Sequence, residues 1–220
     1  MLDHTKKLDQ LTSLRFFAAF LIVIHHSVDL FGIKNIGINF GQGVSFFFVL
    51  SGFILTYVYP KLETWLEIKR FWRARVARVW PAYLVSFCLG FWLLHYQWVN
   101  EIALANLLMV QAWLPLSSYY FSYNAVAWSV STEFFFYLVF PILIYKWNKS
   151  WLLKLIFSGG ILISLIVFSN LLKLPDYGSP LVGSNGLLVT SHGLLYINPL
   201  SRIFEFIFGM CVAHAWSRGG

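Results

Sequence analysis

Residues 8–27 read LDQLTSLRFFAAFLIVIHHS, an apolar stretch of helical length with an arginine near its start and two histidines near its end. Titratable groups inside a membrane helix are energetically costly and commonly mark a functional site. Arg15 and His26 are about three helical turns apart, so an ideal helix places both on one side, roughly 16 Å apart along its axis. His25 points about 100° away from that side. We therefore expect a cation at one membrane surface and a potential base in the opposite half of the helix.

The composition places the whole chain in a membrane. Of its 220 residues, 59% are hydrophobic and only 11% are charged, which excludes an ordinary soluble domain. The net charge of +7 is then explained by cytoplasmic loops beside anionic lipid rather than by nucleic acid. The two cysteines fall in apolar runs, and neither a disulfide framework nor a metal-binding spacing is visible.

Working outward from the first helix, the apolar runs predict an all-α fold, a polytopic transmembrane bundle forming one domain over residues 1–220. About six spans are expected, at residues 14–31, 44–59, 82–98, 127–145, 152–172 and 200–216. Residues 61–81 form a basic amphipathic helix at the interface, residues 101–113 a short re-entrant or interfacial helix, and residues 173–199 a long loop. The distribution of Lys and Arg puts both termini in the cytoplasm.

A few polar residues within these elements are candidates for chemistry. His26 is a candidate general base because Arg15 accompanies it, although a helical histidine is most often only a hydrogen-bonding group. Arg75 and Arg78 share a helix face and either bind a phosphate-bearing ligand or anchor the helix to anionic lipid. Glu133 has no local cation, so a functional and a structural role are equally open.

Two further features favour a structural role. Glu205 is one turn from Arg202, and we expect an ion pair between them that holds helices together. The small residues Ser51 and Gly52 within the second span favour close helix approach at least as much as chemistry.

Five segments resemble the membrane acyltransferase 3 family, whose members are O-acyltransferases of surface polysaccharides. The opening stretch is similar to the family's N-terminal motif through Arg15 and His26. Later motifs follow in the family's order: GQGVSFFFVLSGFIL at residues 41–55, RARVARVWPAY at 73–83, WSVSTEFFFYLVFP at 128–141 and SRIFEFIFGM at 201–210. Family members typically have more helices than the six expected here, so the resemblance implies a domain that is incomplete at its C-terminus.

The resemblance also implies a reaction. An acetyl or other acyl group would pass from cytoplasmic acyl-CoA to a hydroxyl of an envelope polysaccharide, such as lipopolysaccharide, or of a lipid-linked glycan, at a bacterial inner membrane. His26 and Glu133 would be catalytic. Arg15, Arg75 and Arg78 would bind the donor, acetyl-CoA being the simplest, and no metal would take part.

Two other classes of function remain open from the sequence. A transporter or flippase for a lipid-linked or anionic solute would use the same buried charges as a pathway. A truncated chain would also serve as a non-catalytic membrane subunit. The His26→Ala change separates the enzyme from the subunit, because only the enzyme needs the imidazole.

Overall fold

The computed structural model describes residues 16–20, 22–24, 42–176 and 189–219, and its regular elements are helical. Residues 16–20 and 22–24 are helical. The named helices are α2 (Gln42–Val58), α3 (Trp65–Leu94), α4 (Asn100–Leu107), η1 (Gln111–Trp113), α5 (Ser117–Tyr120), η2 (Ala125–Ala127), α6 (Trp128–Ile144), α7 (Trp147–Leu171), the π-helix η3 (Gly193–Ile197) and α8 (Pro199–Gly219). One isolated antiparallel bridge joins Leu116 and Val189. The all-α prediction is thus confirmed for the described part of the chain.

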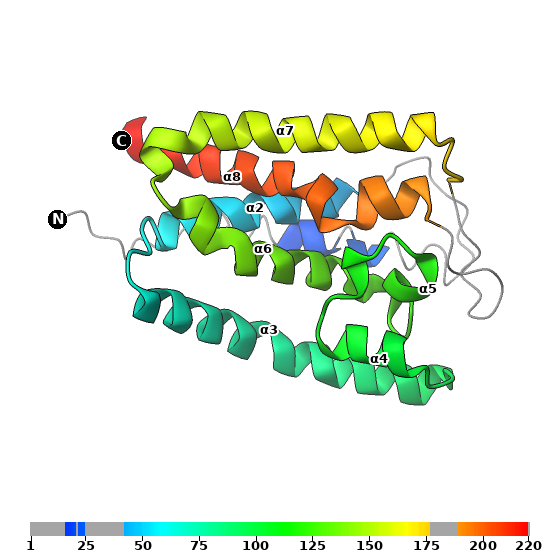
Figure 1. Cartoon of the computed structure of the whole chain (residues 1–220). Coiled ribbons are helices and arrows are strands. Elements are labelled where there is room, and N and C mark those ends of the chain that lie inside the picture. Colours follow the sequence, from blue (N-terminus) through cyan, green and yellow to red (C-terminus); the bar gives the residue numbers. More distant parts are fainter. Residues whose placement is uncertain (1–15, 21, 25–41, 177–188, 220) are drawn as a thin grey trace.

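The long helices run along one another as a bundle (Figure 1). Helices α2, α6, α7 and α8 lie together, α3 runs along one edge, and α4 and α5 cover the end of the bundle opposite the C-terminus. Aromatic rings fill the centre: Phe136 and Phe206 are fully buried and stacked with their centroids 4.8 Å apart. Phe140 packs edge-on against Phe206.

Helices α2 and α8 touch through two glycines. A Cβ atom built on Gly52 would lie 1.9 Å from the carbonyl oxygen of Phe206, and one built on Gly209 would lie 1.8 Å from that of Val49. No side chain fits at either position without separating the two backbones. Both glycines therefore serve packing: the sequence favoured this role for Gly52, whereas the role of Gly209 is seen only in the structure.

Helix α3 differs from the prediction. Its 30 residues run without a break through Pro81, so the predicted interfacial helix at residues 61–81 and the predicted span at residues 82–98 are one element. A capping box starts it: the Thr64 side chain accepts from the backbone N–H of Glu67, and the Glu67 carboxylate accepts from that of Thr64. The prediction places a boundary at Pro81, but the helix continues through it, with Trp80 and Ala82 on either side. Proline is tolerated within membrane helices.

Four helices of the described residues are long and apolar enough to cross a membrane: 65–94, 125–144, 147–171 and 193–218. Helix α2 is apolar but has only 17 residues. The first predicted span lies partly outside the described residues. The fifth starts five residues earlier than expected, at Trp147, and the loop predicted at residues 173–199 ends in the helical turns of η3. Residues 101–113 are not of span length, because α4 has only eight residues.

A two-residue turn joins α6 to α7. Lys146 occupies the left-handed region there, with φ of 49°. Lys154, two turns into α7, reaches back and donates from Nζ to the carbonyl oxygens of Leu143 (2.7 Å) and Tyr145 (2.6 Å). The lysine therefore satisfies carbonyls that the end of α6 leaves without a helical donor.

Candidate active site

A cavity of about 480 Å³ opens between α2, the start of α6, η3 and the helical residues 16–20 and 22–24. Its volume is within the range typical of small-molecule sites. Most of the lining is apolar or aromatic, with a few polar groups: Ala19, Ile22, Val23, Val44, Phe47, Phe48, Phe121, Val126, Trp128, Ser129, Val130, Glu133, His192 and Tyr196. A largely apolar wall with convergent polar groups is the usual character of a ligand site.

Among the described residues that line this cavity, Glu133 is the only carboxylate. The Ser51 hydroxyl, from α2, donates to its Oε1. The hydroxyl of Tyr137, one turn further along the same face of α6, is also hydrogen-bonded to this carboxyl group. Two helices thus hold Glu133 in a fixed orientation at the cavity wall, as expected of a group that positions a reacting partner.

The polar contacts continue from Tyr137 to Arg75. Arg75 is half-buried, donates from Nη2 to the Tyr59 hydroxyl (3.2 Å), and lies over the rings of Tyr59 and Tyr137 at 5.5 and 6.0 Å. Its buried Nε has no hydrogen-bond partner among the described residues. A polar path therefore runs from the cavity carboxylate to a guanidinium that retains an unused donor.

Arg75 and Arg78 do not share one environment. Arg75 faces the bundle, whereas Arg78 is exposed. The structure therefore brings Arg75 and Glu133 into one network through Tyr137, and it leaves Arg78 at the surface beside that network. The i, i+3 spacing put the two arginines on a broad common face, but it did not distinguish their burial.

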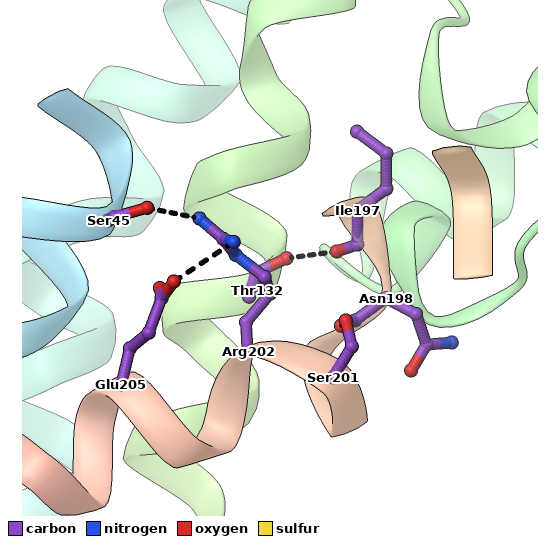
Figure 2. A network of polar contacts seen from close by, with 7 residues as sticks. All are labelled: Ser45, Thr132, Ile197, Asn198, Ser201, Arg202 and Glu205. Atoms are coloured by element: carbon purple, nitrogen blue, oxygen red, sulfur yellow. Dashed lines mark hydrogen bonds and ion pairs between the residues drawn. The ribbon is translucent and has the colours of Figure 1, made fainter. Parts of the chain in front are cut away.

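A second polar cluster lies around Arg202, next to two aromatic residues of the cavity lining (Figure 2). Arg202 Nη1 lies 3.0 Å from Glu205 Oε1, and Arg202 Nη2 donates to the Ser45 hydroxyl at 2.8 Å. The same guanidinium lies over the rings of Tyr196 (4.9 Å) and Phe48 (5.4 Å), which both line the cavity. The predicted ion pair of Glu205 is confirmed, and it positions two aromatic rings at the cavity.

Sequence reasoning missed His192. It lies just before η3 and lines the cavity together with Glu133, although the two are far apart in the chain. Its ring stacks on Tyr196 with centroids 5.0 Å apart. Burial lowers the pKa of His192 below its ordinary value, so the imidazole is neutral at pH 7. No local pattern could indicate this role, because His192 stands in a segment that reads as a loop.

Two of the predicted site residues, Arg15 and His26, lie outside the described residues. The helical segment between them is described in part: Ala19, Ile22 and Val23 line the cavity, and a Cβ on Gly43 of α2 would lie 2.9 Å from the Ile22 side chain. Within the described ranges no cluster of three His, Cys, Asp or Glu side chains could hold a metal.

Comparisons with known proteins identify a family and several relatives. Residues 8–218 match the sequence model of a family described as "Acyltransferase domain". The chain is 32% identical over 153 residues to the acyltransferase MdmB of Streptomyces mycarofaciens, covering 62% of this chain and 39% of that protein. It is 26% identical over 200 residues to the peptidoglycan O-acetyltransferase OatA of Listeria monocytogenes, covering 79% of this chain and 29% of that protein. The chain therefore spans well under half the length of these relatives. No solved structure matches it significantly.

Proposed function

Because the chain belongs to the acyltransferase domain family, we propose that it transfers an acetyl or other acyl group from cytoplasmic acyl-CoA to a hydroxyl of an envelope or exported polysaccharide. The observation that carries the proposal is the polar path from Glu133 to Arg75. It offers a carboxylate in an aromatic cavity at one end and a cation for donor phosphates at the other. The name of the Listeria relative, a peptidoglycan O-acetyltransferase, supports a glycan acceptor and an acetyl group.

In this proposal the chain lies in a bacterial inner membrane. The segment with the helical residues 16–20 and 22–24, together with helices α2, α3, α6, α7 and α8, supplies six spans, and both termini are cytoplasmic. The lysines near the α2–α3 connection and the α6–α7 turn favour this orientation, because cytoplasmic loops carry an excess of positive charge. The cavity with Glu133 is then at the outer end of the bundle.

His26 is the proposed general base. In the sequence it follows Ile22 and Val23, two residues that line the cavity, by four and three positions. Its imidazole takes the proton of the acceptor hydroxyl as that oxygen attacks the thioester carbonyl carbon. The new C–O bond forms, the C–S bond breaks, and the leaving thiolate takes the proton from the imidazolium. General base catalysis of this kind typically contributes about 10²–10⁴ in rate.

The remaining candidates bind and orient. Glu133, held by Ser51 and Tyr137, orients the imidazole or the acceptor hydroxyl. Arg75 and Arg78, with Arg15, bind the donor phosphates through charge-assisted hydrogen bonds; the Nε of Arg75 has no hydrogen-bond partner among the described residues. The aromatic side chains at the cavity, Trp128 and Tyr196 among them, present faces on which a sugar ring packs.

The test is transfer of labelled acetyl from acetyl-CoA in cytoplasm-out vesicles that carry the cell's own surface glycans. Label should appear on glycan with the wild-type chain and with Glu101→Gln, a matched change at an exposed carboxylate outside the cavity. It should be lost with His26→Ala and reduced at least tenfold with Glu133→Gln. Equal labelling in all four would remove both residues from the mechanism, and labelling from donor supplied only outside sealed cells would overturn the proposed direction.

A further inference from the structure

A second cavity, of about 450 Å³, lies where the α2–α3 connection meets the α6–α7 turn. Both of these connections are at the end of the bundle that carries the C-terminus, away from α4 and α5 (Figure 1). Lys61 and Leu62 come from the first connection. Ile144 ends α6, Lys146 lies in the turn, and Lys149 lies in the first turn of α7. Two loops that are distant in sequence thus build one hollow.

The rim of this cavity is basic. It carries three lysines and one carboxylate, Glu63, which pairs with Lys61 at 3.8 Å. Lys146 and Lys149 form no ion pair with any carboxylate of the described residues. Two ammonium groups at this concave surface therefore have no carboxylate partner among the described residues, and their positive charge would attract an anion.

Neutral donors reinforce the positive charge. The cavity includes the first residues of α7, a 25-residue helix whose N-terminus has no side-chain cap. The positive end of a helix dipole and its free N–H groups favour anions, phosphate in particular. Independently, Trp147 lines the cavity with only 4% of its surface exposed, and its buried Nε1 has no hydrogen-bond partner among the described residues.

The floor of the cavity is apolar. Leu62, Ile144 and Trp147 are buried beneath the lysines, and the exposed ring of Tyr145 stands beside them. An inorganic anion such as phosphate would make no contact with these apolar side chains. The match is to a ligand that joins a phosphate to an aromatic or apolar body.

We propose that this cavity, rimmed by Lys61, Lys146 and Lys149, binds a phosphate group of such a ligand. Resting on the proposed function, the source of that phosphate is the acyl-CoA donor. The cavity adjoins the donor end of the polar path, because its lining residue Pro60 directly follows Tyr59, which accepts the hydrogen bond of Arg75. A phospholipid headgroup offers the same chemistry and is the alternative source.

The experiment measures two affinities on the whole chain in detergent. Coenzyme A binding is followed by calorimetric titration, and phosphatidylglycerol binding by thermal stabilisation relative to phosphatidylcholine in mixed micelles. The variants are Lys146→Gln, Lys149→Gln and the double change. Lys69→Gln is the matched control, because Lys69 is an exposed lysine of α3 outside the cavity.

We expect each cavity change to weaken coenzyme A binding about tenfold, the loss of one charge-assisted hydrogen bond, with no effect of the control. An unchanged coenzyme A affinity with loss of the phosphatidylglycerol effect would assign the cavity to lipid. If neither affinity changes in the double variant, the inference is wrong, and the proposed function stands as long as wild type still binds coenzyme A. A wild type that binds no coenzyme A, but whose lipid effect depends on the lysines, would instead refute the proposed donor and keep the phosphate site.

Discussion

The contact between α2 and α8 makes Gly209→Ala a severe change despite its size. The new Cβ would lie 1.8 Å from the Val49 carbonyl oxygen and 2.7 Å from the Val49 carbonyl carbon, whereas ordinary contact begins near 3.4 Å. The two helices would therefore have to separate locally by roughly 1.6 Å, and the obstacle is backbone that cannot rotate away. Overpacking typically lowers the free energy of unfolding by about 1–3 kcal/mol, and we expect Gly209→Ala to be at the upper end of this range.

The same helical bundle supplies a control for that change. Gly160, on α7, has nothing within 4 Å of a built Cβ, so Gly160→Ala should gain about 0.5–1 kcal/mol from helix propensity alone. The assay is unfolding of the purified chain by SDS in mixed micelles, followed by tryptophan fluorescence. We expect Gly209→Ala to lose about 3 kcal/mol and Gly160→Ala to gain slightly. Equal midpoints for the two variants would refute the reasoning about close approach.

Three further outcomes are expected. Glu205→Gln leaves the buried Arg202 without its anionic partner and should cost about 3 kcal/mol in the same unfolding assay; a change below that of Glu101→Gln would contradict the pairing. Arg75→Lys keeps the charge but loses the planar guanidinium, so the KM for acyl-CoA should rise about tenfold with unfolding unchanged; an equal rise in Lys69→Gln would make the effect nonspecific. The pKa of His192 is lowered in the folded chain, so the unfolded chain binds more protons, and the free energy of unfolding should rise with pH up to the ordinary pKa of 6.5. This rise with pH should be smaller in His192→Gln. An equal rise in that variant would show that His192 is not its origin.

Most of the helices could be predicted from hydropathy, because a membrane helix corresponds to a continuous run of apolar residues in the sequence. The Arg202–Glu205 ion pair could also be predicted from the sequence, since residues three apart on a helix are neighbours whatever the tertiary structure. Gly52 was suggested as a packing residue by its type, but only the fold shows the close approach of α2 and α8 and the part of Gly209 in it. Pro81 misled the prediction because local rules for soluble helices treat proline as an end.

The cavity could not be predicted in the same way. Glu133 was a candidate because a carboxylate in an apolar run is costly, yet its partners Ser51 and Tyr137 are ordinary polar residues in their own helices. His192 meets them through tertiary packing alone. The different burial of Arg75 and Arg78 depends on the direction in which α3 faces α6, and neither periodicity nor charge pattern specifies that direction.

The reach of Lys154 across the α6–α7 turn also concerns how the chain assembles. Its two acceptors, the carbonyls of Leu143 and Tyr145, precede it by only eleven and nine residues. Closing so short a loop has a small entropic cost, so the contact can form as soon as the start of α7 is synthesised. The contact needs no residue of α8, so an α6–α7 hairpin can form before α8 is synthesised. Lys154 can thus fix the position of α7 relative to α6 at an early stage of synthesis.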